Sequence, residues 1–380
     1  MTTGGKSPKE EETMSKSLNT IQIEGFKSIK SLNLKMEKMN VLVGANGSGK
    51  SNFIHFFKML SQMAQGNLQG FITKNAGSMG YFFEGPKKTP IFKSTMIFGS
   101  NGYRFEASST VDQKILIDSE ETYYEWRGSK WQIENKGVLE SGLKDWDSRK
   151  SPYNDGPGVQ FYVEKAIKGW TFYHFHDTSE RSELRLPSKV YDNRMLRSYG
   201  DNLASVLWKM RENTPQAYAR IIITVQMVAP FFEDFILEPE KSSNDEQITL
   251  QWKQKGSDFP FQIFHLSDGT LRFIALVTAL FQPTLPTTIL IDEPELGLHP
   301  YALHILSQLL WEVSDRTQII ISTQSSTLMS HFHPEDLIIV DRFEGASRFR
   351  RLENEDYEAW LEEYNLGDLV EKNVIEAGPK

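Results

Sequence analysis

The chain has 380 residues, of which 39% are hydrophobic, and its 42 Lys and Arg against 50 Asp and Glu give a net charge of −8. This composition excludes a disordered or fibrous chain, and the absence of cysteine excludes a disulfide scaffold and a thiolate site. The acidic balance argues against coating of nucleic acid by bulk charge, and no apolar run approaches the ~20 residues that span a bilayer. We therefore expect a soluble cytoplasmic protein without a membrane partner, whose length favours two lobes or a large insertion.

The first part of the chain is expected to combine short strands, a glycine-rich loop and a helix. Residues 1–16 form a polar tail. Alternating residues predict strands at 21–26 and 31–34, and the apolar run 40–43 predicts a third strand that enters the loop. A helical pattern follows over 51–65.

The middle and end of the chain show several further patterns. Residues 80–185 are rich in aromatic residues and short alternating stretches, which predict mostly antiparallel strands and long loops. The later elements are helices expected at 199–212, 214–228, 269–281 and 301–314, and strands at 235–238 and 247–253. The β-branched runs 288–291 and 318–321 are typical of buried parallel strands, so they and the helix between them predict a strand–helix–strand unit.

The glycine-rich loop Gly44–Ser51 matches the phosphate-binding pattern G-x-x-x-x-G-K-[ST]. Its glycines allow backbone N–H groups to turn toward phosphate oxygens at the positive N-terminus of the following helix. Lys50 is expected to reach the β- and γ-phosphates, and the Ser51 hydroxyl to coordinate Mg²⁺. The residues expected to bind the nucleotide here are Asn46, Gly47, Ser48, Gly49, Lys50, Ser51 and Asn52.

A second polar cluster follows the expected strand at 288–291. That strand delivers Asp292 to its carboxyl end, beside the phosphate loop, where the carboxylate can hold Mg²⁺ through water. Glu293 would then face the γ-phosphate and polarise the attacking water as general base. A solvated acidic turn is the alternative interpretation, and the presence of the phosphate loop favours the catalytic one.

The segment Leu266–Thr270, with the sequence LSDGT, begins an apolar helix. Alone it can be a Ser/Asp helix cap. It also resembles the ABC signature, and the order of phosphate loop, signature and the DEP sequence at 292–294 is that of ABC-type ATPases. The sequence IEGFKS at 23–28 is similar to the SMC/RecF branch. The sequence DEPELGLHP at 292–300 resembles stand-alone, defence-associated AAA-type ATPases related to the overcoming-lysogenisation-defect (OLD) nucleases.

This resemblance covers residues 18–60 and 262–342 and implies an α/β fold. The fold would be a P-loop NTPase head of the ABC type, similar to RecF and SMC, with an inserted mixed α+β lobe. The expected organisation is a disordered tail (1–16), an N-terminal ATPase lobe with the P-loop (17–80), an inserted α+β region (81–230), a C-terminal ATPase lobe with signature and Walker B (231–342) and an acidic C-terminal extension (343–380).

The resemblance also implies a mechanism with ATP and Mg²⁺ as ligands. ABC-type heads sandwich ATP, so Ser267, Asp268 and Gly269 of one chain would bind the γ-phosphate held by the P-loop of a second chain. The expected assembly is a homodimer or higher homo-oligomer that ATP joins and hydrolysis releases. Where ABC proteins place a switch histidine, this chain has Gln324, which can hydrogen-bond a phosphate or water without positive charge, so we expect ATP to be held for long periods.

Two histidines form a further candidate site. His174 and His176 lie on one face of an expected strand, a spacing that suits a metal ion. The sequence offers no clear third ligand, which favours structural or interface histidines. The basic stretch 181–197 could contact a phosphate backbone, and a solvated face is the alternative.

These features predict an ATP-hydrolysing molecular switch that controls a separate effector protein, a nuclease or toxin, in antiviral defence. The alternatives are a RecF-like clamp for DNA repair, with DNA as partner, and a scaffold that binds ATP with little turnover. The net negative charge is concentrated in 353–376, which holds nine acidic residues and one basic residue. Aromatic and apolar residues recur there at helical spacing and are expected to dock on the head or on a partner.

Overall fold

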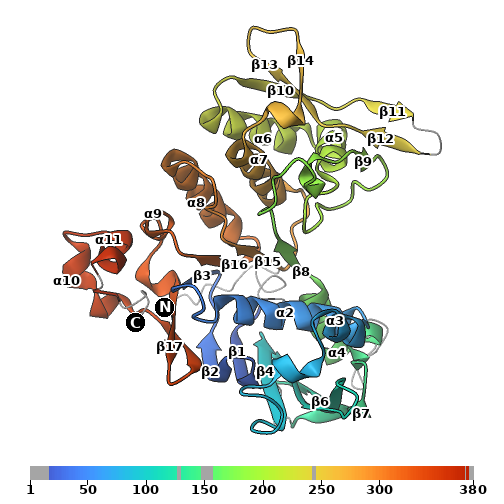
Figure 1. The fold of residues 1–380 in the computed structure, drawn as a ribbon, viewed down its shortest axis with the longest axis vertical. Coiled ribbons are helices and arrows are strands. Elements are labelled where there is room, and N and C mark those ends of the chain that lie inside the picture. The colour runs from blue at the N-terminus through green and yellow to red at the C-terminus, as the bar shows by residue number, and fades with distance from the viewer. Residues whose placement is uncertain (1–16, 126–129, 147–156, 242–244, 373, 376–380) are drawn as a thin grey trace, which may run out of the picture.

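The computed structural model describes residues 17–125, 130–146, 157–241, 245–372 and 374–375 (Figure 1). The tail expected at 1–16 lies outside these residues. A six-stranded central sheet has the order β18-β17-β3-β16-β15-β8, with β18 antiparallel to β17 and the other pairs parallel. Its strands are β3 (Met39–Val43), β8 (Trp170–Tyr173), β15 (Thr288–Asp292), β16 (Gln318–Thr323), β17 (Leu337–Phe343) and β18 (Ala346–Arg351).

A second six-stranded sheet is antiparallel and has the order β2-β1-β4-β5-β6-β7. Its strands are β1 (Thr20–Phe26), β2 (Ile29–Lys35), β4 (Ile91–Phe98), β5 (Asn101–Ser109), β6 (Ile115–Tyr124) and β7 (Gln132–Val138). Helix α2 (Lys50–Ala64) lies between the two sheets, and its buried Phe53, Phe56 and Phe57 belong to one hydrophobic cluster with Leu290 and Ile320 of the central sheet. This cluster fixes the helix that follows the P-loop.

The strand pairing corrects two predicted domain boundaries. β4 belongs to the segment expected as an insertion from residue 81, yet it pairs with β1. β8 belongs to the same segment and pairs with β15 in the central sheet. β18, expected in a C-terminal extension from residue 343, pairs with β17. The physical reason is that a strand edge needs partners for its N–H and C=O groups, and these partners come from distant parts of the chain.

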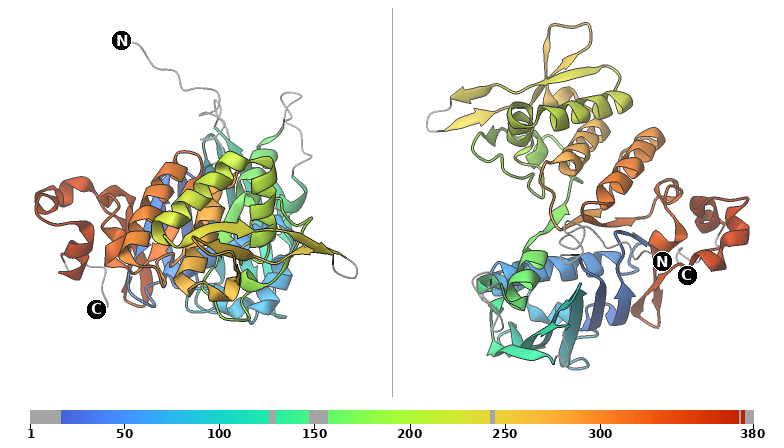
Figure 2. Two further views of the ribbon diagram at one scale, coloured as in Figure 1. Left: turned by 90° about the horizontal axis from the view of Figure 1, so that it is seen from above. Right: turned by 180° about the vertical axis from the view of Figure 1, so that it is seen from behind.

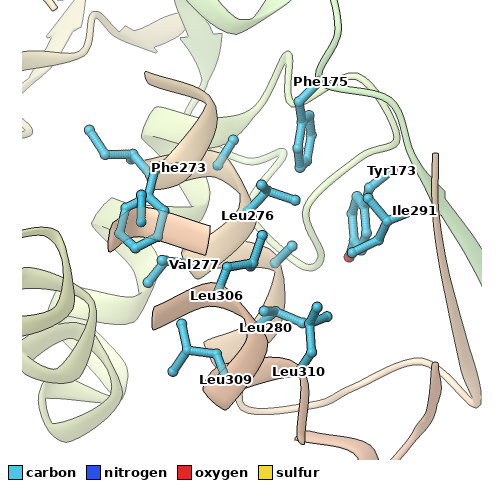
Figure 3. Packing of buried hydrophobic residues seen from close by; sticks show 14 of the residues in the cluster. Tyr173, Phe175, Phe273, Leu276, Val277, Leu280, Ile291, Leu306, Leu309 and Leu310 are labelled. Carbon is cyan, nitrogen blue, oxygen red and sulfur yellow. The ribbon is translucent and has the colours of Figure 1, made fainter. Parts of the chain in front are cut away.

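The opposite face of the central sheet is covered by α7 (Asp268–Phe281) and α8 (Pro300–Ser314). Figure 3 shows Leu276 and Leu280 of α7 beside Leu306 and Leu310 of α8, and Ile291 of β15 beside Tyr173, all in one hydrophobic cluster. Ile291 faces this cluster, whereas its neighbour Leu290 faces α2, which is the two-residue period of a strand. The predicted strand–helix–strand unit at 288–321 is therefore present and is buried on both faces.

A helical body with small sheets lies beyond α7, at the top of Figure 1. It contains α5 (Leu203–Asn213) and α6 (Pro215–Val228), which match the predicted helices closely. Its short strands are β9 (Ser188–Lys189), β10 (Phe232–Ile236), β11 (Pro239–Lys241), β12 (Glu246–Ile248), β13 (Gln251–Gln254) and β14 (Pro260–Gln262). In the lower body, α3 (Leu68–Lys74) and α4 (Val159–Lys168) flank α2; α4 falls in a segment for which we expected strands and loops. None of the helices described has the length and apolar character needed to cross a bilayer.

The C-terminal segment, which holds the short helices α10 (Glu358–Leu361) and α11 (Leu366–Glu371), docks on the head. It packs against α9 (Ser326–Met329), a short helix that follows β16. Leu366 and Leu369 are buried in the same cluster as Leu328 and Met329 of α9. Both views of Figure 2 show this segment at one side of the molecule. Of the two expected docking surfaces, the described residues use the head.

Truncation of Leu369 tests this docking. Leu369→Ala is expected to lower the free energy of unfolding by about 2–5 kcal/mol, because it removes a fully buried side chain and leaves a cavity. Urea denaturation followed by circular dichroism measures the change, with Glu363→Ala, an exposed residue of the same segment, as control. An unfolding midpoint equal to that of wild type would show that the segment does not pack on the head.

Candidate functional site

The P-loop connects β3 to α2 in a conformation that its glycines allow. Gly47 and Gly49 have positive φ angles of 78° and 120°, which side chains other than glycine rarely adopt. A Cβ on Gly49 would also lie 2.0 Å from Ser347 Oγ, so the loop leaves no space for one. Lys50 begins α2, and its ammonium donates to the carbonyls of Gly44 and Ala45 (3.1 Å for the latter). The Lys50 side chain therefore folds back onto the carbonyls at the start of its own loop.

Hydrogen bonds from residues near both ends of the chain hold the P-loop in place. Ser347 of β18 is buried and its hydroxyl donates to the Ser48 carbonyl. The same hydroxyl lies 2.7 Å from Ser28 Oγ, to which Asn52 Nδ2 also donates at 2.7 Å. Sequence reasoning missed Ser347, because nothing in its local sequence indicates a partner 299 residues away.

Removal of this support is expected to weaken nucleotide binding. Ser347→Ala removes the hydroxyl that fixes the Ser48 carbonyl, at a cost of about 0.5–1.5 kcal/mol, or roughly two- to tenfold in the Kd for ATP. Isothermal titration calorimetry with ATP measures the effect. Ser314→Ala, which removes an equally buried hydroxyl at the end of α8, is the matched control. Equal affinities of the two variants would contradict a role for Ser347 in shaping the loop.

The acidic residues after β15 lie beside the P-loop. Asp292 Oδ1 accepts a hydrogen bond from Ser322 Oγ of β16, which fixes the carboxylate at the sheet edge. Glu293 has a left-handed backbone with φ of 43°, and its N–H donates to the Ser322 carbonyl at 2.9 Å. This conformation is uncommon for a residue other than glycine and turns the Glu293 side chain away from the strand direction. Burial lowers the pKa of Lys50, while the charges of Glu293, Asp292 and Glu295 act in the opposite direction.

Gln324 joins the two halves of the site. Its Nε2 donates to Glu293 Oε1 at 2.6 Å and to Asn46 Oδ1 of the P-loop at 2.8 Å. Its backbone N–H donates to Glu295 Oε1 at 3.0 Å, and Thr323 Oγ1 donates to the same oxygen at 2.6 Å. Glu295 therefore holds the loop that carries Gln324, a role that sequence reasoning did not assign to it. The structure thus places Asn46, Gln324 and Glu293 in contact, with Asp292 near enough to Lys50 for its charge to act on the ammonium.

His174 and His176 lie at the end of β8, on the other side of Asp292. His176 Nε2 is 2.7 Å from the Asp292 carbonyl oxygen. Burial, together with the nearby Lys58 ammonium, lowers the pKa of His174 to about 4, so this ring is neutral near pH 7. The two rings are 6.0 Å apart, and the part of the chain that the structure describes holds no group of three His, Asp or Glu residues arranged for a metal ion. The positions of the two rings favour a structural role, in which His176 contacts the end of β15 through the Asp292 carbonyl.

The LSDGT segment lies at the N-terminus of α7. Ser267 caps this helix, since its hydroxyl accepts from Thr270 N at 3.1 Å. Asp268 pairs with the buried Arg185 at 2.9 Å, so its carboxylate orients the segment. Ser267 bonds to Thr270, Asp268 pairs with Arg185 and Gly269 lies against the Gly297 carbonyl, so the contacts of these three residues within the described chain are to residues outside the P-loop. The N-terminus of α7 is accessible, since Ser267 and Asp268 are both exposed.

Two buried arginines tie the LSDGT helix to the site. Arg272 of α7 donates to the carbonyls of Phe175 (2.7 Å) and His176 (2.8 Å), after β8, and to that of Leu296, after β15. Arg185 donates to the carbonyls of Thr178 (2.9 Å) and Ile263 (2.8 Å). Arg185 belongs to the basic stretch 181–197, for which we expected a solvated face or a phosphate contact, yet it is buried against carbonyls and Asp268. The role of Arg272 was not predicted, because its carbonyl partners come from other loops.

Comparisons with known proteins agree with this geometry. Residues 39–330 match the family model described as "AAA domain, putative AbiEii toxin, Type IV TA system". The fold is similar to that of the SmcHead bound to the C-winged helix domain of ScpA, with a TM-score of 0.54 and 16% identity over 90% of this chain and 99% of that chain. No curated protein matches the sequence.

A second solved structure gives the same result. It is the Smc head domain with an extended coiled coil bound to the C-terminal domain of ScpA, derived from Pyrococcus furiosus, with a TM-score of 0.53 and 16% identity over 91% of this chain and 98% of that chain. At this identity the likeness shows the fold alone. The predicted fold class, a P-loop head of the SMC type, is confirmed.

Proposed function

We propose that this chain, which belongs to the AAA-domain family matched by its residues 39–330, is an ATP-hydrolysing switch. The observation that carries this proposal is the Gln324 side chain, which bridges Glu293 and the P-loop residue Asn46. A γ-phosphate held by the loop would lie between these groups, next to the carboxylate that activates water. The substrate class follows from the P-loop, whose lysine and amides suit a nucleoside triphosphate.

Each residue then has a defined task. Lys50 would exchange the carbonyls of Gly44 and Ala45 for the β- and γ-phosphates, at the N-terminus of α2. Ser51 and Asp292 would hold Mg²⁺, which supplies charge neutralisation at the phosphates when bound. Glu293 would accept the proton of the attacking water, and Gln324 would orient that water or the γ-phosphate. The two ligand types, a hydroxyl and a carboxylate beside phosphate oxygens, fit Mg²⁺.

The assembly we propose is a pair of heads with ATP between them. The exposed Ser267 at the positive end of α7 would bind the γ-phosphate held by a second copy, so that ATP joins the heads and hydrolysis parts them. The Asp268–Arg185 pair and Arg272 support this proposal, since they attach the LSDGT segment to the loops around Asp292.

The biological role we propose is control of a separate effector, a nuclease or toxin, in antiviral defence. The family description names a toxin of a type IV toxin–antitoxin system, which supports a role in such systems. The solved SMC heads are bound to domains of ScpA, an example of this fold engaging a second protein. Co-expression with neighbouring genes and purification with and without ATP tests the role: an ATP-dependent complex with a nuclease or toxin supports it, and a complex with DNA-repair proteins contradicts it.

A scaffold with little turnover is the second candidate function. It is favoured by Gln324, whose amide is neutral and hydrogen-bonds the proposed base, Glu293. Steady-state phosphate release with Mg²⁺ and ATP separates the two functions. If the protein is a switch, wild type should release phosphate faster than Glu293→Gln, and chelation of Mg²⁺ should abolish this release. Equal rates in wild type and Glu293→Gln would instead support the scaffold.

A further inference from the structure

The C-terminal segment packs directly against the helix that follows the Gln324 loop. Leu366 and Leu369 of α11 are buried beside Leu328 and Met329 of α9. Both α9 and α11 are short, and in Figure 1 they lie together at the edge of the molecule, away from the body that contains α5 and α6. A helix of four residues such as α9 has little intrinsic stability, so its position depends on what packs against it.

The contact between the two helices is close at one point. A Cβ on Gly367 would lie 2.3 Å from the carbonyl oxygen of Ser326, so the backbones of α9 and α11 touch there. Ser326 Oγ also donates to Glu371 Oε1 at 2.5 Å. The start of α11 is fixed by a capping box, in which Asn365 and Asp368 satisfy each other's backbone N–H groups. The segment therefore meets Ser326 through a rigid helix end.

Only one residue separates Ser326 from Gln324. Ser325 caps α9 by accepting from Leu328 N at 3.1 Å, and its own N–H donates to Thr323 Oγ1 at 3.0 Å. On the far side of this turn, Gln324 Nε2 reaches Glu293 Oε1 at 2.6 Å. The turn from Thr323 to Ser326 is thus fixed by the site at one end and by the C-terminal segment at the other.

We propose that the C-terminal segment positions Gln324 for ATP hydrolysis, with Gly367 and Glu371 as positioning residues that act through Ser326. The proposal rests on the ATPase function proposed above. It separates two properties of the site. The phosphate-binding Lys50 is held by carbonyls of its own loop, whereas the turn that carries Gln324 is bonded to Glu371 of α11 through Ser326. Disturbance of the segment should therefore change turnover and leave nucleotide affinity intact.

Gly367→Ala is the direct test. The added methyl group must displace the Ser326 carbonyl, and since Gly367 lies in a helix with an ordinary φ, alanine adds no backbone strain of its own. We expect kcat to fall by about tenfold with KM for ATP unchanged within about twofold, because a small displacement of a catalytic group costs rate more than binding. Gly80→Ala, where a Cβ meets no atom within 4 Å, is the matched control. An unchanged kcat in Gly367→Ala would overturn the proposal.

A double-variant cycle distinguishes positioning from general destabilisation. In a Gln324→Ala background, Gly367→Ala should have no further effect on kcat, since the group it misplaces is absent. A full tenfold effect in that background would show that Gly367 acts elsewhere. Glu371→Ala, at an exposed position, provides a second variant if Gly367→Ala does not fold, with exposed Glu362→Ala as its control. It should show the same dependence on Gln324.

Hydrogen–deuterium exchange keeps this test independent of turnover. Without nucleotide, Glu371→Ala should increase amide exchange at 323–329 relative to wild type and leave exchange at 50–56 unchanged. No increase at 323–329, or the same increase in both segments, would contradict the attachment of the Gln324 loop to the C-terminal segment. If wild type shows no turnover, the proposed ATPase function fails, and exchange at 323–329 then decides whether the segment holds the Gln324 loop.

Discussion

Glu293→Gln is expected to reduce steady-state ATP hydrolysis by about 10²- to 10⁴-fold, the range that a positioned general base contributes. The physical basis is its position: Glu293 follows the parallel strand β15 in a left-handed backbone conformation, and its carboxylate meets Gln324 Nε2 at 2.6 Å. The amide of Gln occupies the same volume but has no proton affinity to activate water. Affinity for ATP should be retained, because the phosphate-binding residues belong to another segment.

Measurement of this variant separates catalysis from binding. Phosphate release gives turnover, and equilibrium binding of a fluorescent ATP analogue gives affinity. Glu180→Gln, an exposed glutamate in the loop after β8, is the control for the charge change. Retention of more than a tenth of wild-type turnover in Glu293→Gln would contradict its role as the base.

Lys50→Ala is expected to lower turnover strongly by weakening nucleotide binding itself. Charge-assisted hydrogen bonds to phosphate are worth about 1.5–3 kcal/mol, so the Kd for ATP should rise by roughly 10- to 150-fold. In the structure the Lys50 ammonium is buried against the carbonyls of Gly44 and Ala45, where a phosphate would replace them. Lys50→Ala should therefore weaken ATP binding, whereas Glu293→Gln should slow hydrolysis and leave ATP binding intact.

Thermal shift with and without ATP checks this prediction. Wild type should gain stability with ATP by mass action, and Lys50→Ala should not gain it at the same ATP concentration. Because Lys50 also supports the empty loop, the nucleotide-free melting temperature is measured as well, with exposed Lys74→Ala as control. An ATP-induced shift equal to that of wild type would exclude Lys50 from the binding site.

The parts of the site predicted from sequence are those encoded by contiguous residues. The run from Gly44 to Ser51 contains its own glycines, lysine and hydroxyl, and the strand before Asp292 is recognisable by its β-branched residues. Gln324 was identified by its place after the last predicted strand, and the structure brings it to Glu293 and Asn46. Local sequence was sufficient because parallel strands place their carboxyl ends along one sheet edge.

The parts that were missed depend on contacts between distant segments. β18 was taken for the start of an acidic extension, yet its Ser347 supports the P-loop. The antiparallel sheet passes through the expected boundary at residue 80, since the partner of β1 is decided by tertiary packing and not by either strand's sequence. The role of Glu295 was hidden for the same reason: its partners, Thr323 and Gln324, follow a different strand.

The central claim is that ATP joins two heads, with the LSDGT segment of one on the γ-phosphate of the other. The most direct measurement is the mass of Glu293→Gln in solution, by light scattering, with and without Mg²⁺ and ATP. We predict that ATP doubles the mass and that Ser267→Arg, made in the same background, prevents the increase while ATP remains bound. A mass that stays the same when ATP saturates the protein would contradict the account.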